Sequence, residues 1–304
     1  MDGALTIHQG VLYVGRHAKT ADVRSFDLDG HPLETHFRFK DAESGRSSVA
    51  GLCVDDDHRV WIADSAASRL RSFTLVGRPV ATLIGSAEAR DGLGVPVDVC
   101  CRGADDDLLV TVASSGRRRH ALHELHPASK GMRSLRPLGD PDGAFADICD
   151  LTQEEELLYV CERRARRIQI FRDGQFHYAI DLRSLAPDSE PCAVAPAGQG
   201  RILIAFSGRE EGKGSSLLLT DSGGKLLRVI AESGGLDGDV EQPCDIAVDV
   251  ATSDRESRIA VLDHAAERLQ IFTMDGRCYG SFVDDRGNAP KRRTDRRVRE
   301  SDND

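Results

Sequence analysis

Residues 51–77 read GLCVDDDHRVWIADSAASRLRSFTLVG, and this stretch carries the pattern that determines the fold. Short runs of mainly apolar residues are separated by turns rich in Asp, Ala and Ser, and a Gly turn follows the last run. A further run, RPVATLI, occupies residues 78–84. Runs of this length between turn-forming residues are typical of strands joined by hairpins. We therefore expect one antiparallel meander of four strands.

The same unit recurs along the chain. Each copy contains an apolar residue followed three to six positions later by Gly, at Phe26/Gly30, Phe73/Gly77, Leu125/Gly131, Phe171/Gly174, Leu219/Gly223 and Phe272/Gly276. Successive glycines are 47, 54, 43, 49 and 53 residues apart, which is a near-constant period. Such small sheets bury too little apolar area alone, whereas six sheets around an axis cover both faces of each. The sequence predicts an all-β fold, a six-bladed β-propeller, because a pair of β-sandwiches would show no constant period.

The repeats fill residues 1–283, which we expect to form a single propeller. The first unit starts with its inner strand and the last ends with its outer strand, so ring closure would depend on packing between blades 6 and 1. Residues 284–304 are predicted to be a disordered, charged tail, because APKRRTDRRVRESDND at 289–304 holds six basic and four acidic residues. The tail could carry a targeting or nucleic-acid signal, although a solubilising end is the simpler interpretation.

Composition excludes several classes of protein. The 304 residues include 40 Lys and Arg against 50 Asp and Glu, a formal charge of −10, and 40% are hydrophobic. No apolar stretch approaches the ~18 residues of a membrane span, and the N-terminal MDGALTIHQG lacks the features of a secretory signal. We therefore expect a soluble, cytoplasmic protein without a membrane partner. The eight cysteines are expected to be buried free thiols.

The repeat resembles the NHL repeat, whose pattern runs from a proline and an inner strand through a YVAD-like strand to an Arg-Ile/Leu-x-x-Phe strand and a Gly turn. The match is best at 51–77 and at 243–276, and good at LLYVCERRARRIQIFRDG, residues 157–174. The resemblance implies a six-bladed propeller and says little about activity, because this fold serves enzymes, RNA binders and scaffolds. The Asn-His pair of the family is replaced by Ala67-Ser68 and by Ala266-Glu267.

Three units contain an acidic residue followed five positions later by Arg: Asp64–Arg69, Glu162–Arg167 and Asp263–Arg268. In a hairpin these residues flank the turn between the second and third strands, where they can pair across it. We interpret them as structural ion pairs that fix the hairpin.

The starts of the inner strands suggest a metal site. Aligned on the proline of the repeat, they read Pro96-Val97-Asp98, Phe145-Ala146-Asp147, Pro191-Cys192-Ala193 and Pro243-Cys244-Asp245. Inner strands line the axis, so Asp98, Asp147 and Asp245 are expected to converge at one channel mouth. Three carboxylates with backbone carbonyls suit Ca²⁺ or another hard divalent cation.

This part of the sequence is also similar to the six-bladed lyase that cleaves peptidyl-α-hydroxyglycine. In that family His residues just after the proline bind zinc, and an Asp one position later helps to bind calcium. The resemblance implies that Cys192 and Cys244 stand at the His positions and Asp245 at the calcium position. No His occupies these positions here, and two thiolates do not complete a tetrahedral zinc site. The metal ligands of the related lactonase-like propellers are likewise replaced, by Val, Ala and Cys.

A purely structural interpretation stays open: the Asp residues could bind backbone amides, while Cys fills small gaps between blades. A cluster of histidines, His120, His123 and His126, is assigned to the third strand of blade 3. There His123 faces away from the other two, so a metal site is not favoured.

Loop charges separate by loop class. Turns between first and second strands are acidic, with Asp55–Asp57, Asp105–Asp107, Glu154–Glu156, Asp254 and Glu256. Turns between second and third strands are basic, with Arg16, Lys19, Arg117, Arg118, Arg119, Arg163, Arg164, Arg166, Arg209 and Lys213. The two classes emerge on opposite faces of a propeller, so we predict a basic face centred on blades 3 and 4.

Three functional hypotheses follow. The first is a non-catalytic binding or scaffold propeller that recognises a protein or an anionic ligand through Arg117–Arg119, Arg163, Arg164 and Arg166. The second is a metal-assisted lyase or hydrolase that works at the channel mouth with the metal-site residues Asp98, Asp147 and Asp245. The third is an RNA-binding NHL domain, although only 5% of residues are aromatic and none lies in the basic turns.

Overall fold

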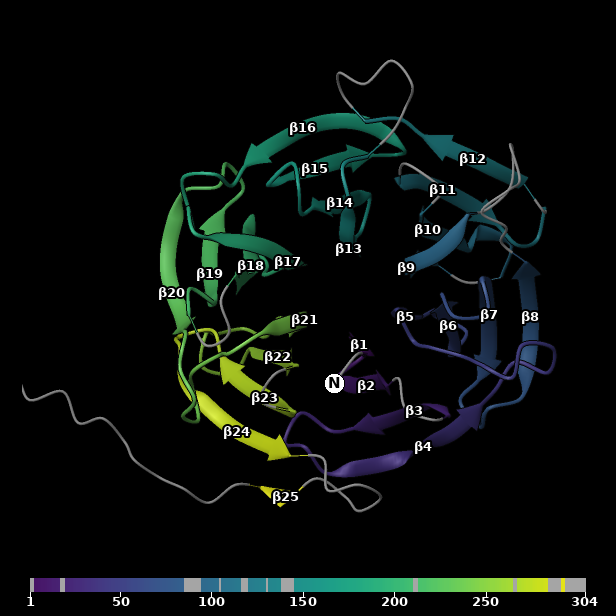
Figure 1. The fold of residues 1–304 in the computed structure, drawn as a ribbon, viewed down its shortest axis with the longest axis horizontal. Coiled ribbons are helices and arrows are strands. Elements are labelled where there is room, and N and C mark those ends of the chain that lie inside the picture. The colour runs from purple at the N-terminus through teal and green to yellow at the C-terminus, as the bar shows by residue number, and fades with distance from the viewer. Residues whose placement is uncertain are drawn as a thin grey trace, which may run out of the picture.

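The structure is a computed structural model, and it describes residues 3–16, 20–84, 94–103, 105–115, 120–129, 131–137, 145–209, 213–264, 267–283 and 291–292. Six small antiparallel sheets form a ring around an axis, and the first strand of each sheet lies innermost (Figure 1). The chain is therefore a six-bladed β-propeller, as the repeat period predicts. Its described helical structure is limited to the 3₁₀ turn η1 (Asp105–Asp107).

Each blade is one contiguous meander in which consecutive strands pair. Blades 1 to 3 comprise β1 (Gly3–His8), β2 (Val11–Arg16), β3 (Ala21–Phe26), β4 (Pro32–Phe39), β5 (Gly51–Val54), β6 (Arg59–Asp64), β7 (Arg69–Thr74), β8 (Pro79–Ile84), β9 (Val95–Arg102), β10 (Leu109–Ser115), β11 (His120–His126) and β12 (Gly131–Leu135). Blades 4 to 6 comprise β13 (Ile148–Glu154), β14 (Leu157–Glu162), β15 (Arg167–Arg172), β16 (Gln175–Asp181), β17 (Ser189–Pro196), β18 (Arg201–Gly208), β19 (Ser216–Asp221), β20 (Leu226–Glu232), β21 (Pro243–Asp249), β22 (Arg258–Asp263), β23 (Arg268–Thr273) and β24 (Cys278–Val283).

Burial explains why the sequence pattern differs from strand to strand. The second strands lie between neighbouring blades, so both faces are covered and their side chains are continuously apolar, as in β6 and β22. The outer strand β4 shows the alternation of a half-exposed strand: Phe37 and Phe39 are buried, whereas His36 and Arg38 are exposed. Apolar runs therefore indicate strands inside the ring, and alternation indicates its rim.

One outer strand is displaced from its predicted place. The repeat pattern places Gly131 in the turn that follows Leu125, but the fourth strand of blade 3, β12, begins at Gly131. Gly131 pairs with His126, so it belongs to the strand and does not form the turn. The third strand of this blade, β11, includes all three histidines, as expected, and His123 is buried against Ser134.

The ring closes without an exchanged strand. Inner strand β1 packs beside β21, and the backbone N–H of Leu5 donates to Oδ2 of Asp245 at 2.7 Å. Apolar side chains of blades 6 and 1 form one shared core, which includes Leu12, Leu262 and Phe282. Closure by packing of blades 6 and 1 is thus confirmed, with a hydrogen bond that the sequence did not indicate.

The three acidic–arginine pairs occupy the predicted cross-strand positions. Ion pairs form across two of these turns, Glu162–Arg167 and Asp263–Arg268. In blade 2, however, Arg69 lies 3.1 Å from Asp41 of the preceding loop, and Asp64 lies 3.4 Å from Arg71. Asp64 also accepts the N–H of Ser48 at 2.9 Å, so it anchors the segment that enters the inner strand. Asp64 therefore stabilises the loop before β5 as well as the hairpin of blade 2.

Two other expectations concern the ends and the thiols. Within the predicted tail, β25 (Lys291–Arg292) pairs with β24, and the other residues of 284–304 lie outside the described part of the chain. All eight cysteines are free thiols as expected, but four of them are only partly buried, namely Cys101, Cys149, Cys244 and Cys278. In the described part of the chain, no helix has the length and hydrophobicity that crossing a bilayer requires.

Candidate functional site

The inner strands carry a repeated bulge near the channel mouth. In blades 3 to 6 the pairing with the second strand skips one residue, and the skipped residues are Val97, Cys149, Cys192 and Cys244. The residues after these bulges are Asp98, Asp150, Ala193 and Asp245, and in blades 1 and 2, whose inner pairing has no such shift, Ala4 and Gly51 occupy the equivalent level of the channel. The structure thus brings together three aspartates, which we call the axial trio: Asp98, Asp150 and Asp245.

Each axial carboxylate connects two blades. Asp98 accepts the N–H of Val99 at 2.7 Å and that of Leu151, in the next blade, at 2.6 Å. Asp150 likewise accepts the N–H of Val194 at 2.6 Å. The third member, Asp245, binds Leu5 as described above, together with the N–H following it in its own strand, at 2.7 Å. These hydrogen bonds match the structural interpretation of the aspartates.

Burial changes the acidity of the axial trio. Burial is the main cause that raises the pKa of Asp98 well above its usual value, and the charge of Asp245 adds to it. Burial is likewise the main cause that raises the pKa of Asp150 and of Asp245. The charge of Asp98 adds to the effect on Asp150, and the charge of Asp150 adds to the effect on Asp245. After burial, the charge of Asp98 is the largest cause that raises the pKa of Asp150, so these two carboxyl groups resist ionising together. Close approach of the blades leaves no space for a side chain at Gly51, where a Cβ would lie 2.6 Å from Cα of Asp98.

Asp147 does not join this group. It precedes β13 with a positive φ of 68°, and its carboxylate lies 3.6 Å from Nε2 of His120 and 3.8 Å from Nε of Arg164. Aligning Phe145 with the prolines of other blades moved the register by three residues, because the bulge at Cys149 cannot be recognised from apolar periodicity. The dipeptide Cys-Asp at 149–150, repeated at 244–245, was the signal that identifies Asp150 instead.

The cysteines of the bulges are engaged with backbone carbonyls. The thiol of Cys149 donates to the carbonyl of Pro191 at 3.4 Å, and that of Cys192 donates to the carbonyl of Pro243 at 3.0 Å. Cys244 donates to the carbonyl of Leu262 at 3.4 Å. Burial raises the pKa of Cys192 well above its usual value, so it holds its proton. The contacts of Cys149 and Cys192 connect neighbouring blades, whereas that of Cys244 lies within blade 6. The hypothesis of a metal bound by Cys192 and Cys244 stays a prediction.

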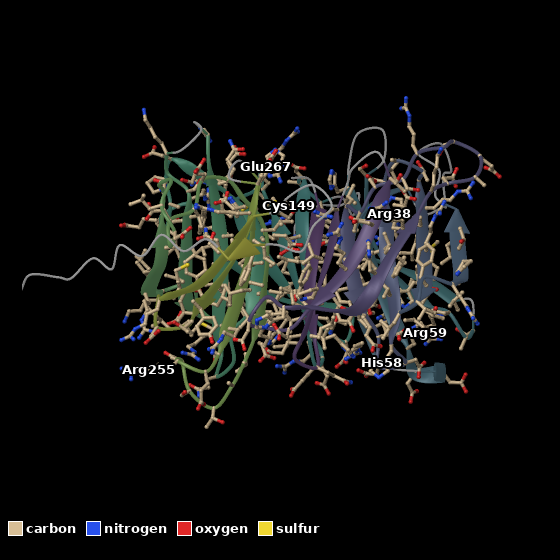
Figure 2. The ribbon with its side chains drawn as sticks, turned by 90° about the horizontal axis from the view of Figure 1, so that it is seen from below. Arg38, His58, Arg59, Cys149, Arg255 and Glu267 are labelled. Carbon is tan, nitrogen blue, oxygen red and sulfur yellow. The ribbon has the colours of Figure 1, made fainter. Side chains whose placement is uncertain are left out.

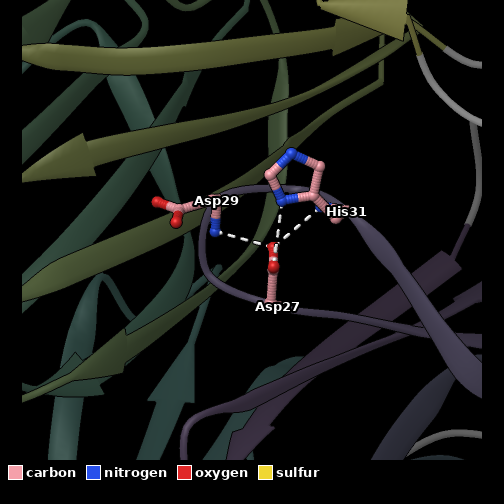
Figure 3. A group of neighbouring side chains, drawn as sticks. All are labelled: Asp27, Asp29 and His31. Atoms are coloured by element: carbon pink, nitrogen blue, oxygen red, sulfur yellow. Dashed lines mark hydrogen bonds and ion pairs between the residues drawn. The ribbon is translucent and has the colours of Figure 1, made fainter.

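Among the described residues, one group of three or more His, Cys, Asp or Glu side chains has its ligand atoms within 4.8 Å of one another, namely Asp27, Asp29 and His31 (Figure 3). These residues form the turn between β3 and β4. Oδ1 of Asp27 accepts the N–H of Asp29 at 3.0 Å and that of His31 at 2.8 Å, while Oδ2 lies 3.0 Å from Nδ1 of His31. The carboxylate is therefore occupied by its own turn.

A cavity of about 310 Å³ runs along the axis and is lined by all six inner strands. The axial trio lies at one level of it, and His8, Gln153 and Glu154 lie toward the other end. Val250, which also lines the cavity, is 47% exposed, so the cavity meets solvent at this end.

The basic residues of blade 4 surround Asp147. Arg164 is exposed, with 83% of its side chain accessible, whereas Arg163 is partly buried. Burial lowers the pKa of Arg163, but Cys149 and Asp147 outweigh this effect and raise it overall. Nδ1 of His120 accepts the N–H of Ile148 at 3.1 Å, which leaves Nε2 to carry the imidazole hydrogen toward Asp147. We call His120, Asp147, Arg163 and Arg164 the mouth cluster.

The other predicted ligand-binding arginines differ from these two. Arg166 donates to the carbonyls of Ala186 and Pro187, so it holds the loop before β17. Arg117, Arg118 and Arg119 lie outside the described residues. The basic turns therefore contribute Arg163 and Arg164 to the mouth cluster, and Arg166 to the scaffold.

The two loop classes lie on opposite faces, but the acidic face also carries arginines. In Figure 2 Glu267 and Cys149 lie near one face, and Arg59 and Arg255 near the other. Asp55 accepts Nε of Arg59 at 2.8 Å, and Asp254 lies 2.8 Å from Arg201. These arginines begin second strands or lie in the acidic turns, and the sequence map of turns had not counted them. The predicted acidic face is therefore partly neutralised.

Comparisons with known proteins support the architecture. A chain of a nidogen–laminin complex aligns with a TM-score of 0.60 at 14% identity, over 90% of this chain and 93% of that one. Virginiamycin B lyase from Staphylococcus aureus gives 0.57 at 10% identity, over 93% and 84%. A streptogramin B lyase structure gives 0.58 at 13% identity, over 92% and 82%. No protein-family model matches the chain, and no curated protein matches its sequence. At these identities the likeness shows the fold alone, and membership of the NHL family stays a prediction.

Proposed function

We propose that this chain is a non-catalytic binding propeller that recognises a carboxylate-bearing segment of a partner protein at the mouth cluster. The observation that carries the proposal is an excess of cationic donors. The carboxylate of Asp147 lies 3.8 Å from Nε of Arg164 and 3.6 Å from Nε2 of His120, and the backbone N–H of Arg163 donates to the Asp147 carbonyl at 2.9 Å. The cluster is open to solvent, since Arg164 is largely exposed. A second carboxylate would therefore find unused donors there.

The geometry of the existing pairs supports exchange of partners. Distances of 3.6 Å from His120 and 3.8 Å from Arg164 to Asp147 exceed those of direct hydrogen bonds. The pair of Asp147 with the exposed Arg164 contributes only about 0–1 kcal/mol, so an incoming anion would displace it at little cost. A fork of guanidinium N–H groups matches the two oxygens of a carboxylate.

A protein partner is favoured over RNA. Base recognition needs aromatic stacking surfaces, yet aromatic residues are 5% of the chain and its formal charge is −10. The nidogen–laminin complex is a protein assembly that contains a similarly folded chain, which serves as a precedent for the fold. Arg117–Arg119 precede His120 directly in the sequence, and the proposal includes them as further contacts.

Fluorescence anisotropy with a labelled oligo-glutamate peptide tests the proposal. The double variant Arg163→Glu/Arg164→Glu should weaken binding by about tenfold or more, because each reversal replaces an attraction with a repulsion of about 0.5–1 kcal/mol. The matched control is Arg255→Glu on the opposite face, where an exposed arginine lies 3.5 Å from Asp275. Equal loss in both variants, or tighter binding of oligo-uridine than of the peptide, would refute the proposal.

A further inference from the structure

The axial cavity has a chemical character that the mouth cluster does not use. Its lining contains four carboxylates and one imidazole, and none of the described lining residues is Lys or Arg. Three carboxylates belong to the axial trio, and the fourth is that of Glu154. Such a lining attracts cations and rejects anions.

The acidic groups lie at two separate levels. Asp150 and Glu154 are in the same strand, β13, four residues apart, which corresponds to about 13 Å of extended chain. Between these levels the lining includes Thr6 and Thr152 as well as Ile7. The cavity is thus acidic at both ends and mainly polar along its length.

At the open end of the cavity, polar atoms of Glu154 and His8 are available to bind a ligand. Burial raises the pKa of Glu154, and only one of its oxygens receives a hydrogen bond from Tyr159, at 3.4 Å. His8 also lines this end, in β1, on the blade opposite β13 in the ring. Among the described residues, no group is within hydrogen-bonding distance of the buried Nε2 atom of His8. Its pKa is lowered by burial, so this imidazole stays neutral and offers no competing positive charge.

We propose that the axial cavity binds an elongated aliphatic cation with an amine at each end, such as a linear polyamine. One ammonium group would donate hydrogen bonds to the axial trio and the other to Glu154, while the chain between them passes Thr6 and Thr152. The ammonium at the trio takes the place of a carboxyl proton there, and that proton leaves to solvent. A single metal ion reaches only one of the two levels, whereas a linear polyamine reaches both.

Isothermal titration with spermidine tests the proposal, with putrescine, n-octylamine and CaCl₂ as comparison ligands. Spermidine should bind more tightly than putrescine, which is shorter, and than n-octylamine, which has one amine. Glu154→Gln should weaken the binding of spermidine by about tenfold, because it removes a charged hydrogen-bond acceptor. Glu156→Gln, in the exposed part of the same turn, is the matched control and should leave binding unchanged.

A second variant examines the closed end. Asp150→Asn keeps an acceptor for the N–H of Val194 and removes the charge, so it should also weaken spermidine while the chain stays folded by circular dichroism. Absence of spermidine binding to the wild-type protein would overturn the proposal. Binding of Ca²⁺ without binding of any amine would also overturn it and would favour a metal at the trio. Spermidine binding that is unchanged in Glu154→Gln would overturn it too. None of these outcomes involves the mouth cluster, so the two proposals fail independently.

Discussion

Oδ2 of Asp245 lies 2.7 Å from the backbone nitrogen of Leu5, 240 residues away in the sequence. This hydrogen bond joins the last blade to the first at the level of the axial trio. Asp98 and Asp150 make the same kind of contact to the blades that follow them. The carboxylates therefore act as connectors of the ring, and several measurable consequences follow from that role.

Asp245→Ala should destabilise the propeller by about 2–4 kcal/mol, because the N–H groups of Leu5 and Ile246 would lose their acceptor. Asp245→Asn retains one acceptor oxygen and should cost less. Urea unfolding followed by tryptophan fluorescence measures both variants against Asp29→Ala, a change in an exposed turn. A loss under 0.5 kcal/mol in Asp245→Ala would contradict the proposed role in closure.

The raised pKa values of the axial trio predict a pH dependence. An acid whose pKa is higher in the folded chain contributes its full stability below its unfolded pKa, near 3.8, and loses that contribution as the pH rises toward the folded value. Each such group lowers the free energy of unfolding by up to about 1.4 kcal/mol per pH unit in this window. The stability of the wild-type protein should therefore fall, relative to Asp150→Asn, as the pH rises above about 4. Parallel stability curves for the two proteins would show that Asp150 titrates normally.

Gly51→Ala should destabilise the chain by about 1–3 kcal/mol, since the new Cβ would lie 2.6 Å from Cα of Asp98 and 2.7 Å from the nitrogen of Val99. These are backbone atoms, so relief requires blades 2 and 3 to separate. Gly10→Ala is a useful comparison, because nothing lies within 4 Å of its Cβ, although its positive φ adds some strain. Thermal unfolding should show the larger decrease for Gly51→Ala, and equal decreases would argue against close packing at this level.

Thiol reactivity should follow burial. Cys192 is buried, hydrogen-bonded to Pro243, and has a raised pKa, so we expect it to resist alkylation by iodoacetamide in the native protein. After denaturation all eight thiols should react, because none is in a disulfide. Mass spectrometry of digested protein follows each site. Rapid alkylation of native Cys192 would show that this part of the ring opens readily.

Much of the fold could be predicted from the sequence, because it is encoded in local patterns repeated six times. The apolar runs of β6 and β22 and the Gly turn after Phe73 identify strands without knowledge of their neighbours. The displaced strand β12 is an exception, since Gly131 could belong to either a turn or a strand.

The candidate site was harder to predict, because it depends on register and on contacts between blades. A bulge at Cys149 moves Asp150 into the trio and leaves Asp147 outside it. A pattern of turn charges likewise cannot show that Arg166 is used by the carbonyls of Ala186 and Pro187, or that Arg59 neutralises Asp55. These contacts bring together residues that the repeat pattern treats as independent.

The most direct test of the account is hydrogen–deuterium exchange of the wild-type protein with and without the oligo-glutamate peptide. Binding at the mouth cluster predicts slower exchange in the turn that contains Arg163 and Arg164 and in the segment from Asp147 to Cys149. Exchange in residues 55–58 and 250–257, on the opposite face, should not change. Protection confined to those opposite loops, or no protection at the mouth cluster at a peptide concentration that saturates the anisotropy signal, would contradict the proposed function.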